Sequence, residues 1–356
     1  MVYRRMQMAK IITVDALKEE RRNQTVVEKI PYVIRGEQKY VEKKLVNGEM
    51  ELIKLDKPFG EMMTAMEGVE NLLKKVALDV DFGREAVPLL YKPIYRTITN
   101  ADFPQIVPIN EFVQAQVVFL QHIEGQQIEF GTRTMYTNDG VPIITWTAGF
   151  DGWTLETEKF DATWSIEAYN RALGEAYNAL LNHLHFYPIL SESGYATKNH
   201  TAKNTTEATY LQKLRATLRA AIQHANADLN PVTNARRNPS IVLCSTANLM
   251  DIQDALGRMV IGGTEYPALG QLNTIIAYDG WSVTVGANTY TYPGVSSGVC
   301  YLIDPKRYFM ELVKADLTIE TGEPDTTRLV RAPIVAWAMR GVLASPLDAV
   351  EEVELP

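Results

Sequence analysis

The feature that most constrains the fold is a stretch of chain that cannot form a core by itself. Residues 123–158 are rich in glycine, threonine and aromatic residues. They contain the turn sequence Asn138-Asp139-Gly140, which predicts a long two-stranded loop with a tight tip near Asn138. A two-stranded ribbon is marginally stable alone in water, so this loop needs another surface to pack against.

A second stretch, residues 1–57, also has few apolar residues with which to close a core. Its short alternating runs and the turn sequence Asn47-Gly48 indicate short strands and a hairpin. Such a segment gains stability mainly by packing on something else. It is therefore predicted to be an extended arm that lies on another copy of the chain.

The net charge of −8 is unevenly distributed along the chain. Residues 1–57 hold 13 of the 35 basic and 9 of the 43 acidic residues, which leaves 22 basic against 34 acidic residues in the remainder. Phosphate binding needs clustered lysine and arginine, so the acidic remainder argues against a nucleic-acid-binding surface. The basic segment 1–57 has the charge to touch a nucleic acid, but contact with another copy is the preferred interpretation.

Apolar residues at spacings of three and four predict helices at 59–80 and 163–186. Pro188 is expected to end the second helix, which is the longer of the two. Gly174 lies in the middle of that helix, where it costs about 1 kcal/mol relative to alanine. A close packing partner at Gly174 would explain why this cost is tolerated.

The later part of the chain is predicted to mix helices and strands, so the fold class is α+β. Asn204 and Glu207 have the spacing of a capping box and predict the start of another helix. From residue 239 onward, apolar runs predict strands at 240–244, 273–277, 282–285, 290–292, 299–303, 309–320, 331–343 and 350–355. A short helix at 246–256, ended by Gly257, follows the first of them.

No arrangement of residues in the sequence supports catalysis, a metal site or a cofactor. His183 and His185 are two apart on a predicted helix and point about 200° apart, so they cannot share a metal ion. Gly262-Gly263 lacks the lysine and hydroxyl residue that complete a phosphate-binding loop. The chain is therefore predicted not to be an enzyme.

The two cysteines and the N-terminus indicate a chain made in a reducing compartment. Cys244 and Cys300 each lie in an apolar run, and buried free thiols are expected. The first residues are basic without an apolar run behind them, so no secretory signal is predicted. No apolar run reaches the roughly 18 residues that span a bilayer, so no membrane is expected.

The order of these parts resembles the Hong Kong 97-type major capsid proteins of tailed phages, most clearly from Val113 to the C-terminus. Residues 123–158 look like the extended loop of that family, and residues 163–186 look like its spine helix. Residues 240–257 resemble the strand and helix of its axial domain. Further similar segments are those at 268–276, 298–307 and 329–343. The resemblance rests on the order of elements, since none of these segments is a sharp motif.

The resemblance implies a division of the chain. Its regions are an N-terminal arm (1–57), the start of a peripheral domain (58–122), the extended loop (123–158), the spine helix with more of the peripheral domain (159–238), an axial domain (239–297) and return strands that complete both domains (298–356). Tyr136, Trp146 and Trp153 of the loop are expected to contact a neighbouring subunit. The alternative is that these three side chains pack within the loop itself.

The implied function is self-assembly through hexamers and pentamers into an icosahedral shell around double-stranded DNA. The protein would be made in the host cytoplasm and end in the virion, with scaffolding, portal and decoration proteins as further partners. One alternative is an encapsulin-type nanocompartment, which shares the fold; the arm and the elaborated axial domain favour the phage shell. The other is a cytoplasmic α+β enzyme, for which the sequence offers no catalytic residues.

The sequence also predicts how subunits are held together. Some members of the family weld subunits by an isopeptide bond between a loop lysine and an asparagine near the chain end. Here no lysine occurs between Lys92 and Lys159, and no asparagine follows Asn288. Assembled protein, boiled in detergent and run on a denaturing gel, should therefore give a single band at the mass of one chain. A ladder of covalent multimers would contradict this prediction.

Overall fold

The predicted α+β class is confirmed by the computed structural model of the chain, in which helices and strands are mixed along the sequence. The structure describes residues 10–13, 28–34, 36–43, 45–46, 49–50, 66–107, 113–116, 132–135, 140–150, 163–228, 236–261, 264–305, 308–321 and 334–356. No helix among these residues has both the length and the apolar composition needed to cross a membrane.

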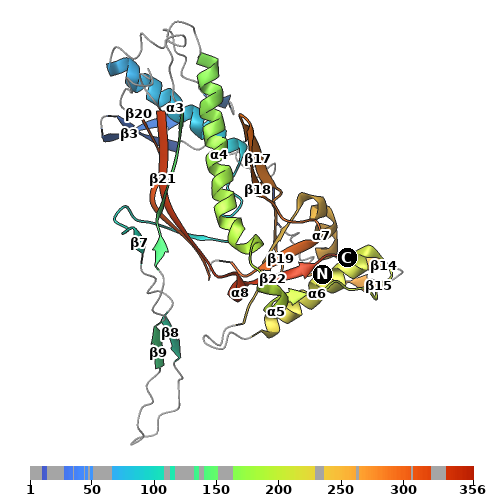
Figure 1. The fold of residues 1–356 in the computed structure, drawn as a ribbon. Helices are drawn as coiled ribbons and strands as arrows, with labels where there is room; N and C mark the ends of the chain where they lie inside the picture. Colours follow the sequence, from blue (N-terminus) through green and yellow to red (C-terminus); the bar gives the residue numbers. More distant parts are fainter. Residues whose placement is uncertain are drawn as a thin grey trace, which may run out of the picture.

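One long helix, α4 (Thr163–Leu190), runs along the molecule and ends at a compact lobe (Figure 1). Its 28 residues correspond to a length of about 42 Å. The helix begins where the sequence predicted, but the expectation that Pro188 ends it is wrong, because Pro188 lies inside the last turn. The backbone N–H and the hydroxyl of Ser191 both donate to the Tyr187 carbonyl, at 2.9 and 2.7 Å, so the helix end is satisfied beyond the proline.

A four-stranded sheet lies beside α4, in the order β11-β21-β20-β6. Its two long members are β20 (Phe309–Thr321) and β21 (Ile334–Ala344), which pair antiparallel and curve alongside the helix in Figure 1. The flanking strands are β11 (Ile144–Phe150), antiparallel to β21, and β6 (Arg96–Thr99), parallel to β20. The long strands predicted at 309–320 and 331–343 are thus confirmed over the described residues.

The compact lobe is built on a six-stranded sheet, and its predicted strands are confirmed. Alternating residues of its strand β13 enter two different cores. Val242 and Cys244 face α6 (Tyr210–Ala227) and α7 (Leu249–Leu256), and Leu243 belongs to the core that includes the end of α4. In spatial order the strands are β1 (Lys10–Ile12), β16 (Thr274–Ala277), β13 (Ile241–Cys244), β19 (Val299–Ile303), β22 (Val350–Glu354) and β12 (His200–Thr201).

Several short elements complete the fold. The predicted helix at 246–256 consists of a 3₁₀ turn, η1, that leads into α7 and ends at Gly257. The strands predicted at 282–285 and 290–292 form one hairpin, β17–β18, which lies next to α4. The bounds are η1 (Thr246–Asn248), β4 (Leu45–Val46), β5 (Glu49–Met50), β14 (Met259–Ile261), β15 (Thr264–Tyr266), β17 (Gly280–Val285), β18 (Asn288–Pro293), α5 (Tyr195–Lys198) and α8 (Pro346–Ala349).

The start of α6 differs from the prediction. The capping box is formed by Thr209 and Gln212, with the Gln212 backbone N–H donating to Thr209 Oγ1 and the Thr209 backbone N–H donating to Gln212 Oε1. Asn204 instead closes a turn before the helix, since its Oδ1 accepts from the backbone N–H groups of Thr206 and Glu207. Both pairs have the same spacing, and the apolar stripe facing the lobe sheet decides which of them starts the helix.

The described strands of residues 1–57 pack on their own chain. The hairpin β2 (Glu28–Ile34) and β3 (Glu37–Lys43) packs on β20 and on the helix α3 (Met66–Ala86). The Tyr32 hydroxyl donates to Glu70 of α3 at 3.1 Å. β1 adds to the lobe sheet in parallel with β16. β4 and β5 pair with each other on either side of Asn47-Gly48, which lies outside the described residues. Contact of this segment with another copy of the chain stays a prediction.

The helix predicted at 59–80 is α3 (Met66–Ala86), which extends beyond the expected end. It stops just before Val87, whose helical conformation is disfavoured by the following Pro88. The part of the prediction at 59–65 lies outside the described residues.

The predicted loop begins and turns at different residues from those expected. β8 (Val113–Gln116) pairs with β9 (Thr132–Met135), and Gln116 lies opposite Thr132. The residues that join these two strands, 117–131, lie outside the described residues, and the pairing shows that the prediction of a tip near Asn138 is wrong. After the hairpin, β10 (Val141–Pro142) pairs with β7 (Ile106–Val107), and β11 joins the four-stranded sheet because β21 offers it a long apolar strand to pair with.

The close packing partner expected at Gly174 is present. A Cβ atom at Gly174 would overlap the backbone carbonyl of Val80 on α3, and one at Gly83 would overlap the carbonyl of Arg171 on α4. The backbones of the two helices thus touch at this crossing, where only glycine leaves the necessary room.

We expect Gly174→Ala to lower the free energy of unfolding by about 1–3 kcal/mol, because backbone atoms cannot move aside for the new methyl group as a flexible side chain would. Urea unfolding of the variant and of the native chain gives the difference. Gly270→Ala is the matched control, since a Cβ there has no atom within 4 Å. Equal stability of Gly174→Ala and the native chain would show that the crossing is looser than described.

Candidate assembly site and the polar network behind it

A buried carboxylate joins the long strands to the segment that precedes β6. The side chain of Glu311, on β20, is fully buried. It accepts hydrogen bonds from the Tyr91 hydroxyl at 2.7 Å, from the Thr97 hydroxyl at 2.7 Å and from Lys92 Nζ at 3.0 Å. Arg340 of β21 adds a charged hydrogen bond to the same carboxylate. Every described partner is polar or positive, as a buried negative charge requires.

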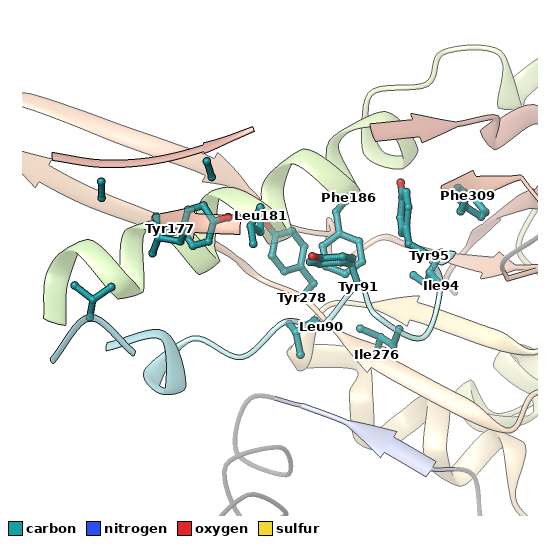
Figure 2. Close-up of a cluster of buried hydrophobic side chains, with 14 of the residues drawn as sticks. Leu90, Tyr91, Ile94, Tyr95, Tyr177, Leu181, Phe186, Ile276, Tyr278 and Phe309 are labelled. Carbon is teal, nitrogen blue, oxygen red and sulfur yellow. The ribbon is translucent and has the colours of Figure 1, made fainter. Parts of the chain in front are cut away.

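Arg340 extends this network from the sheet to α4. Its Nε donates to the Tyr177 hydroxyl at 2.8 Å, and its second terminal nitrogen donates to Asp316. Glu311 and Arg340 are both buried, so the pair ties two neighbouring strands and the helix together away from solvent. Figure 2 shows Tyr177 projecting from α4 and Tyr91 among the buried apolar side chains.

The charges of the network are set by burial and by one another. Burial opposes ionisation of Glu311, but His185, Arg340 and Lys92 outweigh it and lower its pKa to about 2. Burial likewise opposes the charge on Arg340, yet its negative and phenolic neighbours raise its pKa above the usual value. Near neutral pH the network therefore contains an ionised carboxylate and an ionised guanidinium.

His185 and His183 of α4 face different surroundings. The ring of His185 stacks on Tyr91 with 3.5 Å between ring centroids, and its Nδ1–H donates to the Leu181 carbonyl at 2.6 Å. The ring of His183 stacks on Tyr292 of β18 instead. Among the described residues, no group of His, Cys, Asp and Glu has the arrangement of a metal site.

Burial raises the pKa of the free thiols Cys244 and Cys300, which are both in the lobe core.

Of the three aromatic residues predicted to contact a neighbouring subunit, one lies in the part of the chain that the structure describes. Trp146 lies on β11, opposite Ala338 of β21, and is half-buried; it belongs to the sheet and not to the loop hairpin. Tyr136 and Trp153 lie outside the described residues. The contact of these three residues with another subunit stays a prediction.

An apolar surface, the loop-base patch, lies where the hairpin leaves the body. It consists of Ile106, Pro142 and Ile144, and the side chains of Ile106 and Ile144 are 60% and 47% exposed. Ile106 and Pro142 are opposite each other in an antiparallel pair, so their side chains share a face. Exposed apolar residues gathered in this way mark contact sites more often than isolated ones do.

Sequence reasoning missed the buried network. One signal was present, because Glu311 and Arg340 each interrupt a short apolar run on a strand, in Phe-Met-Glu-Leu-Val and Ala-Met-Arg-Gly-Val. A charged residue among apolar neighbours on a buried strand needs a partner of opposite charge. The sequence does not say which strands are adjacent, so it could not supply the pair.

No protein-family model matches the sequence, and no curated protein matches it. Among solved structures, the chain is similar to a virus-like particle from Pyrococcus furiosus, at 12% identity and a TM-score of 0.46 over 79% of this chain and 98% of that chain. It is also similar to the mature capsid of bacteriophage PhiM1, at 11% identity and a TM-score of 0.44 over 74% and 86% of the two chains. A third similar structure is the capsid of the cyanophage P-SCSP1u, at 13% identity and a TM-score of 0.42 over 74% of this chain and 87% of that chain.

The chain resembles phage capsid proteins. This is the resemblance that the order of elements predicted, and the comparison returns it.

We expect His185 to make the protein less stable in mild acid. Burial lowers the pKa of His185 from 6.5 to about 4, so the unfolded chain binds a proton at a higher pH than the folded chain does. The stabilising contribution is complete above pH 6.5 and is lost as the pH falls toward 4, about 2 kcal/mol between pH 7 and pH 4.5. Urea unfolding at both pH values should show a smaller loss for His185→Gln than for the native chain.

The lower pH of this comparison separates His185 from Glu311. The pKa of Glu311 is lowered from 4.5 to about 2, so its contribution is present above pH 4.5 and is lost only below it. A loss in His185→Gln equal to that of the native chain would mean that the imidazole is not held neutral by the fold.

Proposed function

We propose that this chain is the major capsid subunit of a tailed phage. Copies assemble through hexamers and pentamers into an icosahedral shell that encloses double-stranded DNA, without covalent crosslinks. The subunit is a structural component of the virion, made in the host cytoplasm, and it performs no catalysis. Scaffolding, portal and decoration proteins are the further partners that such a shell would use, and the DNA is enclosed without sequence-specific contacts.

The observation that carries this proposal is the hairpin β8–β9. Figure 1 shows it extending away from the other described elements, beyond β7. In an isolated two-stranded ribbon in water, the side chains are not buried and the outer edge of each strand has unpaired backbone groups. Packing on a neighbouring copy would recover both, and repetition of that head-to-tail contact closes rings.

The buried network supports the same interpretation. A subunit that places an extended hairpin on a neighbour needs a body that holds the base of the hairpin at a fixed angle. Arg340 lies opposite Ile144 in the sheet and is bonded to Glu311 and to Tyr177 of α4, so it anchors the strand from which the hairpin departs. Ionic contacts buried in this way are costly to break, roughly 3–5 kcal/mol when one partner is removed.

Negative-stain electron microscopy of the purified protein, alone and with its genomic neighbours, tests the proposal. Closed polyhedral particles, or rings of five and six, are the expected result, because the hairpin would then be buried between copies. Particles that contain nucleic acid would support the phage shell, whereas particles filled with a cargo protein would favour the nanocompartment. A uniform monomer or dimer under every assembly condition would contradict a shell of either kind.

The same preparations test the predicted contact at Trp146. We expect Trp146→Ala to give fewer particles than the native chain at equal protein concentration. Thr147→Ala is the matched control, because Thr147 is the next residue on β11, is exposed and faces the other side of the sheet. Thermal unfolding of both variants shows whether they fold, and unchanged assembly by folded Trp146→Ala would rule out the contact.

A further inference from the structure

The long strand pair contains an irregularity in its middle. Val313 of β20 lies opposite Arg340, Ala315 lies opposite Met339, and Thr318 lies opposite Trp337. Residues 313–318 of β20 therefore run beside the shorter segment 337–340 of β21, with a register shift on each side of Ala315. Two successive bulges on one strand lengthen that strand relative to its partner, bend the pair and increase its twist. We call these two segments the bulge joint.

The bulge joint is also where the sheet changes its flanking strand. On one side of it, Met310–Val313 of β20 pair with β6. On the other side, Ile334–Arg340 of β21 pair with β11, and no described strand continues β6. The long pair is thus shared by two three-stranded sheets that meet at Val313 and Arg340. Figure 1 shows one end of the pair near α8 and the other near α3 and β3.

Side chains fix the bulge joint from two places. Lys314 reaches the loop before β7, where its Nζ donates to the Phe103 carbonyl at 2.6 Å. Asp316 accepts from Arg340 and from the Tyr177 hydroxyl of α4 at 3.3 Å, and also from the backbone N–H of Leu317 at 2.7 Å. Lys314 and Asp316 have no paired residue opposite them on β21, so their side chains replace the missing strand contacts.

The charge of Asp316 is maintained by its surroundings. Asp316 is exposed, and the positive charges of Arg84 of α3 and Arg340 lower its pKa. Arg84 in turn donates to Asn178 of α4 at 3.2 Å. The bend in the strand pair is therefore linked to both long helices through charged groups, while the strands themselves supply only part of the hydrogen bonding there.

We propose that the bulge joint, fixed by Asp316 to Arg340 and by Lys314 to Phe103, sets the curvature of the subunit and hence the size of the shell that it builds. This inference rests on the proposed function. A bend held by a few polar contacts is easier to alter than a packed core, so releasing one contact changes the angle between the two halves of the pair without unfolding either half. Shell size depends on that angle because each subunit repeats it around the particle.

The test compares shells built by Asp316→Asn and by Lys314→Met with native shells, assembled under one condition and measured by electron microscopy. Asp316→Asn removes the negative charge that faces Arg340, and Lys314→Met removes the donor to the Phe103 carbonyl, while each keeps nearly the same side-chain shape. Asp254→Asn is the matched control, because Asp254 is an exposed carboxylate on α7, outside the bulge joint, and undergoes the same chemical change as Asp316. We expect a shifted mean diameter or a second size class for the two variants and the native diameter for the control.

A second measurement uses unassembled subunits, so that the inference and the shell proposal can fail separately. Amide hydrogen exchange at 313–318 should be roughly tenfold faster in Asp316→Asn than in the native chain, and unchanged in the lobe strand β13. Native diameters for both folded variants would overturn the inference. If the native chain forms no particles, the shell proposal fails. If the exchange rate at 313–318 in Asp316→Asn equals that of the native chain, Asp316 does not hold the bulge joint, and the inference fails as well.

Discussion

The ionic contact between Glu311 and Arg340 is the interaction on which the arrangement of the four-stranded sheet and α4 depends. Both side chains are buried on adjacent strands, so each would be strongly unfavourable without the other. Their remaining partners come from elements far apart in the sequence, including Tyr91 before β6 and Tyr177 on α4. An apolar core tolerates small shifts of its elements, whereas a buried charge pair with several directed hydrogen bonds defines one position for each of them. This contact therefore fixes how the helix lies against the long strands.

The molecule combines two ways of gaining stability. The lobe buries both faces of its sheet, with β13 between a core facing α4 and a core facing α6 and α7. The hairpin β8–β9 has no comparable packing on the described part of its own chain (Figure 1). A chain with a rigid body and an uncovered extended hairpin is suited to assembly, because the hairpin can be buried against another copy. The crossing of α3 and α4 at Gly83 and Gly174 belongs to the rigid body, since backbone contact leaves little room for movement.

Local patterns identified the elements well and their partners poorly. The spacing of apolar residues predicted α4 from its first residue, and the mid-helix Gly174 correctly indicated a close neighbour. The turn sequence at Asn138 predicted a hairpin tip that the pairing of Gln116 with Thr132 rules out. A turn sequence permits a tight turn, but the register of a hairpin is chosen by what its strands can pair with. The choice of Thr209 over Asn204 as the cap of α6 has the same origin, since both sequences permit a helix start and packing selects one.

The sequence by itself determined the α+β class, the long helix and the strands of the lobe, because these depend on residue type and on spacing over a few positions. Only the tertiary structure decided that Trp146 lies in the sheet, that the strands β1 to β3 pack on their own chain, and that Glu311 meets Arg340. Strand pairing joins residues far apart in the chain, and its free energy depends on the whole set of partners available. No local pattern carries that information, so the contacts that set the shape of this subunit emerge only when the fold is complete.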